Sequence, residues 1–189
     1  MLPKPIWLEG ERVFLIDQTK LPVQLEVIEI CTEEQMWDAI KRLVVRGAPA
    51  IGLAGAFGVY IGAVRKLEAG VLTAENFAEE VHKTGAYLDT SRPTAVNLHW
   101  AVSRMDNVAE ALIASGEQNV QKLVQGLLRE CEAMLDEDIA ACRAIGEYGA
   151  DLLEQIPDFH AMLTHCNAGA LATSMYGTAL APAYIMQER

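Results

Sequence analysis

The feature that most constrains the fold is an uncharged segment that runs from Gly47 to Val64. It is marginal in length for a membrane span and holds Pro49 and several glycines, so we expect a buried helix of a soluble protein. At ~100° per residue, its glycines fall within an arc of roughly 120°, and the large apolar residues lie opposite. A helix that is apolar all round is buried, and a glycine face lets another backbone or a ligand come close. The glycines of this face are Gly52, Gly55, Gly58 and Gly62.

Residues 6–30, ahead of this helix, predict a small antiparallel β-meander. Residues 12–17 form a short apolar run, and residues 18–22 supply a turn. Apolar and polar residues then alternate over residues 23–27, which is typical of a half-buried strand.

Capping and breaking residues predict that most of the chain is helical. Thr32 with Gln35 forms a capping box, Pro93 suits a first helical turn, and Gly116 suits a helix end. The expected helices run from Thr32 to Gly47, from Pro49 onward, from Thr73 through Leu88, from Pro93 to Gly116, and from about Asn119 to Pro157.

The last segment predicts a strand, a turn and a helix. Residues 159–164 are short and apolar, residues 165–169 are turn-forming, and residues 170–187 are helical in pattern apart from Pro182. This order is how an α/β sheet begins. A lone parallel-type strand cannot satisfy its edges, so we expect the rest of that sheet to come from further polypeptide or from another chain.

Together these patterns predict a mainly helical α+β chain with two parts. The β-meander and a helical domain should occupy residues 1–157. Residues 158–189 should be the start of a truncated Rossmann-like α/β domain.

The charge balance excludes several functions. A net formal charge of −11 disfavours sequence-independent binding of nucleic acid and binding to an anionic membrane surface. The N-terminal residues lack the basic and apolar regions of a signal peptide. The four cysteines form no CxxC pair and are interpreted as reduced thiols, so we expect a cytoplasmic protein. A small anionic substrate can still bind where local cations or helix ends override the global field.

Two arginines stand just before proline-started helices. Arg46 is followed by Gly47 and Ala48, and Arg92 precedes the second helix directly. Free N–H groups at a helix start point at incoming anions, and the glycine allows an anion to approach the backbone. The pair is equally consistent with a phosphate site and with solvated or salt-bridging side chains, whereas one such arginine alone is more typical of a solvated or salt-bridging side chain.

Cys166 lies in the expected turn between His165 and Asn167. A nearby helix start and a cationic histidine would favour the thiolate, which can act as acid, base or nucleophile. The alternative is a small thiol that only packs. Asn167 and Gly169 either orient an anion or shape the turn. The histidines form no recognisable metal-ligand cluster with cysteine or carboxylates, so no metal site is expected.

Three segments resemble the motifs of the 5-methylthioribose-1-phosphate isomerase family, which also includes ribose-1,5-bisphosphate isomerase and the regulatory subunits of initiation factor 2B. They are residues 45–52, residues 91–98 and residues 163–173. They occur in the family's order at family-like spacing, and the resemblance covers essentially the whole chain.

The resemblance implies an enzyme of methionine salvage that isomerises 5-methylthioribose 1-phosphate to 5-methylthioribulose 1-phosphate. It implies no metal or organic cofactor, and a homodimer in the full-length form. By position, Arg46, Gly47, Ala48 and Arg92 match the family's substrate and phosphate contacts. Cys166 matches its active-site cysteine.

The sequence departs from the family in length. Members continue for about as long again, and the acidic residue that acts as acid/base partner is expected in that further half. No Asp or Glu of this chain can be assigned that role, so we expect little activity from these residues alone. The open alternatives are a ribose-1,5-bisphosphate isomerase, a non-catalytic subunit like those of initiation factor 2B, or a short chain completed by a separate partner. The substrate's 5-substituent is not assigned by any residue here.

Overall fold

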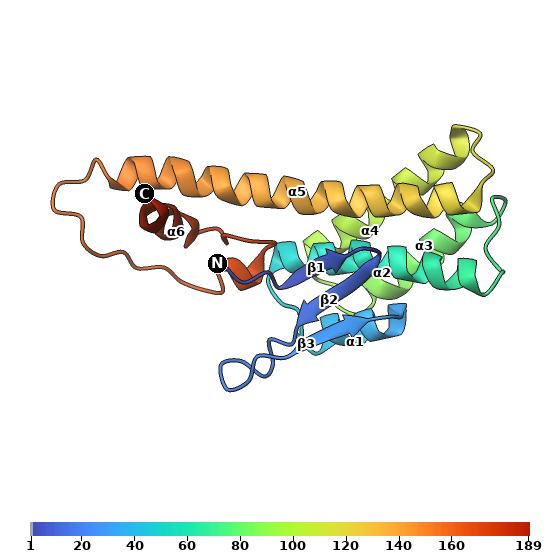
Figure 1. The fold of residues 1–189 in the computed structure, drawn as a ribbon, viewed down its shortest axis with the longest axis horizontal. Helices are drawn as coiled ribbons and strands as arrows, with labels where there is room; N and C mark the ends of the chain where they lie inside the picture. The colour runs from blue at the N-terminus through green and yellow to red at the C-terminus, as the bar shows by residue number, and fades with distance from the viewer. Residues whose placement is uncertain (1) are drawn as a thin grey trace.

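The computed structural model describes residues 2–189 as an elongated molecule built along one long helix, α5 (Figure 1). It is a mainly helical α+β chain with a small antiparallel sheet, which confirms the expected fold class. In chain order the elements are β1 (Ile6–Glu9), β2 (Arg12–Ile16), β3 (Val27–Ile30), α1 (Glu33–Lys41), α2 (Ala48–Glu68), α3 (Phe77–Asp89), α4 (Val96–Ala114), α5 (Val120–Leu153), the 3-10 helix η1 (Ala170–Ala172) and α6 (Ala181–Glu188).

The three strands form the expected meander in the order β1-β2-β3, with both pairs antiparallel. Ile6 pairs with Leu15, and both side chains are fully buried on the face that meets the helices. The alternating segment at residues 23–26 does not join the sheet, and β3 begins at Val27. Val23 is 95% exposed there, so alternation without a covering layer did not make a strand.

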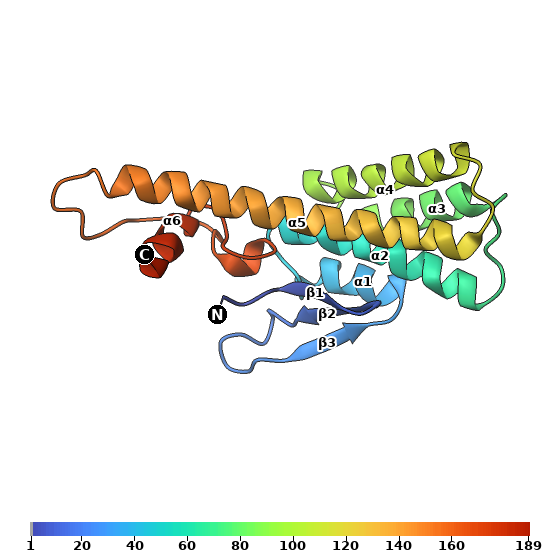
Figure 2. The ribbon, with the colours of Figure 1, turned by 45° about the horizontal axis from the view of Figure 1, so that its top comes forward.

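α2 is the centre of the fold and contacts α1, α3, α4, α5 and β1. Both views show it running alongside α5 (Figures 1 and 2). Among the described residues it is the one helix long and apolar enough to cross a membrane, but 78% of the relevant window is buried inside the protein. The burial identifies α2 as the core helix that the uncharged sequence predicts.

The glycine face of α2 is where α4, α3 and α1 come closest. A Cβ atom at Gly52 would lie 2.9 Å from the backbone oxygen of Asn97 on α4. A Cβ at Gly58 would lie 2.8 Å from Cδ1 of Leu88 on α3 and 2.9 Å from Cγ of Met36 on α1. The glycines thus allow the close helix packing that their spacing predicts.

Two helices begin at the capping residues that the sequence predicts. Thr32 Oγ1 accepts the N–H of Gln35 at 3.1 Å, and Gln35 Oε1 accepts the N–H of Cys31 at 2.7 Å, which caps α1. Asn119 Oδ1 accepts the N–H of Lys122 at 3.1 Å at the start of α5. These local hydrogen bonds confirm both predicted starts.

Three helix boundaries differ from the prediction. α3 begins at Phe77 and not at Thr73, because residues 74–76 form a turn in which Thr73 Oγ1 accepts the N–H of Asn76. α1 ends at Lys41 and not at Gly47, because Leu43 adopts a left-handed conformation with φ of 63° and turns the chain out of the helix. α4 begins at Val96 and not at Pro93, because the N–H of Ala95 donates to the carbonyl of Arg92 in a turn. The prolines and glycines thus predicted that a helix is interrupted in each region, but not the residue at which it begins or ends.

The predicted strand at residues 159–164 is wrong: the segment is extended but irregular in this structure. A strand is defined by ladder hydrogen bonds, and no strand among residues 2–189 pairs with this segment. The predicted continuous helix at residues 170–187 is also wrong. η1 is a single turn, and a loop follows in which Thr173 Oγ1 accepts the N–H of Gly177, itself at φ of 78°.

α6 packs against the far end of α5 in a second, smaller hydrophobic cluster, which contains Cys142, Ala150, Tyr176, Ala181 and Ile185. The main core lies at the other end of α5, under the sheet and the four preceding helices. α5 therefore links both clusters. The domain boundary predicted after residue 157 stays a prediction.

The close approach at Gly52 gives a first test. Gly52→Ala should lower the free energy of unfolding by about 1–3 kcal/mol, because the new methyl group meets the backbone of α4 rather than a movable side chain. Urea denaturation followed by circular dichroism measures this.

Gly85→Ala in α3 is the matched control, because a Cβ there meets atoms no closer than 3.4 Å. It should be neutral or stabilising by up to about 1 kcal/mol, the helix-propensity gain of alanine over glycine. Equal effects of the two substitutions would contradict the packing argument.

Candidate functional site

A hollow of about 1040 Å³ opens where the start of α2, the turn before α4 and the segment after residue 164 meet. The structure brings nearly all of the predicted site residues to its wall: Arg46, Gly47, Ala48, Arg92, Cys166 and Asn167. Gly169 lies outside the wall, where a Cβ would contact the side chains of Leu180 and Tyr184. Segments more than a hundred residues apart in sequence therefore share one cavity.

The wall is closed by a backbone contact between α2 and η1. Gly47, the N-cap of α2, has φ of 99°, and a Cβ on it would lie 2.4 Å from the Cα of Ala172. No side chain caps this helix start, so its first N–H groups have no side-chain acceptor among the described residues. A glycine is required here both by its conformation and by the space.

Gln18 anchors η1 from the other side. Its Nε2 donates to the carbonyl of Leu171 at 2.9 Å, and its backbone N–H donates to the carbonyl of Val44. The side chain is only 4% exposed. Sequence reasoning missed this residue because it interpreted residues 18–22 only as a turn. The fold alone shows that η1 lies against Gln18.

The charged side chains that line the hollow are positive, whereas the net charge of the protein is negative. The protein has 26 Asp and Glu residues and a net charge of −11, yet no acidic side chain of the described residues lines this hollow. Arg46 and Arg92 line it, and within residues 2–189 neither guanidinium forms an ion pair. Unpaired arginines at an uncapped helix start are suited to bind a phosphate or carboxylate.

The cysteines differ in environment. Burial raises the pKa of the Cys131 thiol well above its usual value. The pKa of the Cys142 thiol is also raised, mainly by burial and to a lesser extent by the negative charge of Asp138. Cys31 and Cys166 are exposed, and Cys166 has φ of 75° in the loop that faces the hollow. The expected helix start after this loop is wrong, because η1 has three residues and α6 begins only at Ala181.

Further polar groups on the wall were not predicted from the sequence. Thr94 and Asn97 come from the region of α4, and Thr173 and Thr178 come from the loop around η1. That loop is fixed to α5, because the N–H of Ser174 donates to Asp138 Oδ2 at 2.6 Å. No group of three or more His, Cys, Asp or Glu side chains placed to hold a metal ion occurs in residues 2–189.

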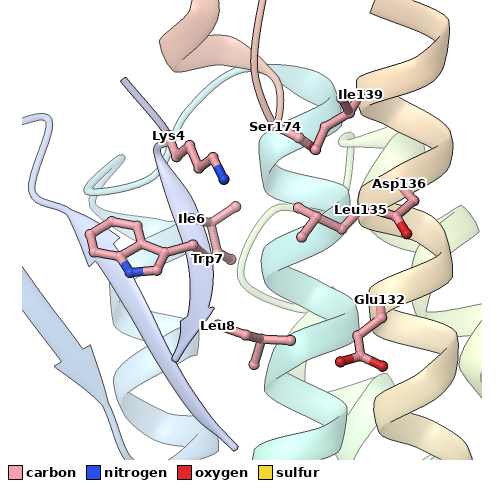
Figure 3. A pocket seen from close by; sticks show the side chains of 9 residues that line it. All are labelled: Lys4, Ile6, Trp7, Leu8, Glu132, Leu135, Asp136, Ile139 and Ser174. Carbon is pink, nitrogen blue, oxygen red and sulfur yellow. The ribbon is translucent and has the colours of Figure 1, made fainter. Parts of the chain in front are cut away.

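A separate cavity of about 350 Å³ lies between β1 and α5 and has different chemistry (Figure 3). Lys4 and Trp7 lie on the strand side, and Glu132 and Asp136 lie on the helix side. Two carboxylates against one lysine make it unsuited to an anion. It shares no residue with the larger hollow, so the phosphate argument concerns the larger hollow alone.

Sequence comparison places these residues among known proteins. Residues 44–184 match the profile of the Initiation factor 2 subunit family. The chain is 52% identical over 183 residues to the 5-deoxyribose 1-phosphate isomerase of Moorella thermoacetica, covering 97% of this chain and 49% of that protein. It is 45% identical over 180 residues to the methylthioribose-1-phosphate isomerase of a Nostoc species, which covers 95% of this chain and 50% of that protein.

Solved structures give the same picture. The 5-methylthioribose 1-phosphate isomerase of Pyrococcus horikoshii superposes with a TM-score of 0.86 at 35% identity, over 99% of this chain and 50% of that one. Subunit delta of the translation initiation factor eIF-2B from A. fulgidus superposes with a TM-score of 0.83 at 39% identity. The match covers 98% of this chain and 52% of that one. The chain thus spans about half the length of the relatives it matches.

The unpaired arginines generate a binding prediction. Arg46→Gln and Arg92→Gln should each weaken binding of inorganic phosphate by roughly tenfold, the cost of losing one charge-assisted hydrogen bond. Isothermal titration calorimetry measures the affinities. Arg129→Gln is the control, since Arg129 also forms no ion pair in the described residues but lies on α5 away from the hollow. An equal loss in all three variants would show only a net-charge effect and would contradict the site.

The cysteine environments generate a second prediction. Iodoacetamide should modify the exposed Cys31 and Cys166 and leave Cys131 and Cys142 unmodified in the folded protein. A sugar phosphate that fills the hollow should slow modification of Cys166 only. Peptide mass spectrometry measures each site, and Cys31 is the internal control. Equal protection at both exposed thiols, or at neither, would contradict a ligand bound beside Cys166.

Proposed function

Because the chain belongs to the Initiation factor 2 subunit family, we propose that it is the phosphate-binding, thiol-bearing part of a sugar-phosphate isomerase. The observation that carries this proposal is the hollow that holds two unpaired arginines and an exposed thiol without any carboxylate among the described residues. The relatives at 52% and 45% identity bear isomerase names, which supports the same reaction class.

The proposed reaction converts an aldose 1-phosphate to the corresponding ketose 1-phosphate. The anomeric carbon carries the phosphate, so no free aldehyde exists and the ring must open with help from a proton donor. Arg46, Arg92 and the start of α2 hold the phosphate, which fixes C1 and C2 of the sugar near Cys166. The thiol takes part in moving a proton from C2 to C1, while a second acid/base group protonates the ring oxygen.

The second group is proposed to be a carboxyl group from outside this chain segment. The relatives are about twice as long, and no Asp or Glu of the described residues lines the hollow. Exposed apolar side chains on the far half of α5 and after it, such as Tyr148 at 77% and Leu163 at 99%, fit a surface that further polypeptide covers. We accordingly propose that residues 158–189 begin a second domain, and that the full-length form is a cytoplasmic homodimer.

The proposed substrate is 5-methylthioribose 1-phosphate, in a methionine-salvage role. 5-Deoxyribose 1-phosphate is the second candidate, because a relative at 52% identity has a name that specifies it. A non-catalytic role is the alternative from a different class, because eIF-2B subunit delta has the same fold at 39% identity. The exposed thiol at the anion site favours the enzyme, since a binding module does not require it.

The function is tested by turnover. This chain alone should convert little or no 5-methylthioribose 1-phosphate, whereas a longer polypeptide that contains it should be active. In that longer form Cys166→Ser should lower kcat by roughly 100-fold or more, the usual contribution of a proton-transfer group. Cys31→Ser is the control and should leave kcat unchanged.

Two outcomes would overturn parts of the proposal. Robust turnover by the 189-residue chain would show that the acid/base partner lies within it. Full activity of Cys166→Ser in the longer form would remove the thiol from the mechanism and favour the regulatory role.

A further inference from the structure

We propose that the cavity between β1 and α5 binds a small zwitterion, namely an α-amino acid with an apolar side chain (Figure 3). The volume of about 350 Å³ lies at the lower end of the range for small-molecule sites, so it suits a small ligand. The cavity shares no lining residue with the phosphate hollow, and this inference therefore does not rest on the proposed function. The charged and hydroxyl side chains on its wall are Lys4, Glu132, Asp136 and Ser174.

Charges of opposite sign line the two sides of this cavity without pairing. Lys4 extends from the strand side toward α5, whereas Glu132 and Asp136 lie one helical turn apart on α5 (Figure 3). None of the three forms an ion pair within residues 2–189. Two carboxylates at this spacing on a helix repel each other. A ligand with both an ammonium and a carboxylate group supplies a partner for both signs, which neither a simple cation nor a simple anion does.

A buried hydroxyl at the same cavity also lacks a partner. Ser174 is 1% exposed, and its Oγ atom forms no hydrogen bond with residues 2–189. The residue is nevertheless fixed in place, because its backbone N–H donates to Asp138 Oδ2 at 2.6 Å. Buried hydroxyl groups are normally paired, so an unpaired one on the wall of a cavity indicates where a polar group of a ligand belongs.

The wall between the charged groups is apolar. Ile6 and Leu8 project from β1 toward α5, where Leu135 faces them (Figure 3). Ile6 is fully buried, and Leu8 and Leu135 are partly buried against the main core. Aliphatic side chains offer no partner to a hydroxyl or amide group of a ligand, whereas they gain from contact with an alkyl group. The side chain of the bound amino acid is therefore apolar, as in leucine.

The positions of the polar groups also assign an orientation to the ligand. In Figure 3 Lys4 and Ser174 lie toward one end of the cavity, and Glu132 lies toward the other. The ligand's carboxylate accepts hydrogen bonds from the Lys4 ammonium and the Ser174 hydroxyl. Its ammonium group donates to Glu132 and Asp136, which places a positive charge beside the two repelling carboxylates.

The test is isothermal titration calorimetry of this chain with three ligands that share one carbon skeleton. L-Leucine carries both charges, isopentylamine lacks the carboxylate, and 4-methylpentanoate lacks the ammonium group. Leucine should bind roughly tenfold more tightly than either analogue, because each analogue loses the charge-assisted hydrogen bonds at one end. Saturating inorganic phosphate should leave the affinity for leucine unchanged, because the arginine-lined hollow is a different cavity.

Substitutions locate the bound leucine. Lys4→Gln should lower the affinity for leucine about threefold to fivefold, the effect of one exposed charge pair, and leave that for isopentylamine unchanged. Glu132→Gln should lower the affinity for both ligands. Ser174→Ala should weaken leucine binding without lowering the free energy of unfolding, because the hydroxyl has no partner within residues 2–189. Glu110→Gln is the matched control, since Glu110 is an exposed residue of α4 that does not line this cavity.

Several results would overturn the proposal. Failure of leucine to bind would remove the site, and equal affinities for leucine and isopentylamine would show a site for cations only. Loss of leucine binding in the presence of phosphate would place leucine in the arginine-lined hollow. Equal effects of Glu132→Gln and Glu110→Gln would show only a net-charge effect. Binding by this chain but not by a longer polypeptide that contains it would show that further residues fill the cavity.

Discussion

The N-cap and the second turn of α2 come into close contact with two segments that are distant in sequence, and the site depends on both contacts. Gly52 meets the backbone of Asn97 on α4, and Gly47 meets Ala172 of η1. A side chain at either position would separate the layers by more than packing allows, since interiors leave little room for an added methyl group. These contacts set the distance between Arg46, Arg92 and Cys166, which come from separate parts of the chain.

The same arrangement produces a cationic site in an acidic protein. Most arginines of the chain are neutralised on the surface, as Arg65 is by Glu33 and Glu34. Arg46 and Arg92 face a hollow whose described lining holds no carboxylate, so their charge remains available to a ligand. The N–H groups of the uncapped α2 start add to that field. Local placement of charge, and not net charge, therefore decides which ligand binds.

The two ends of α5 differ in how completely they are covered. Its first half belongs to the main core beneath the sheet and helices, whereas its second half packs mainly against α6. Figures 1 and 2 show the long loop after α5 running out and back beside that end. The loop that carries Cys166 is held by the segment before α6, because the carbonyl of Ala168 accepts the N–H groups of Thr178 and Leu180. This support places the thiol at the hollow even though the strand expected before it does not form.

The sequence alone determined the parts of this protein that depend on neighbours along the chain. The uncharged run and glycine spacing of α2, the caps at Thr32 and Asn119, and the three motifs were all identifiable, because helix sterics and capping are local. Tertiary structure alone decided the rest: the left-handed turn at Leu43, the irregular path of residues 159–164, and the place of Gln18 under η1. Ladder pairing, burial and charge neutralisation depend on which distant groups come together, and only the folded chain specifies those partners.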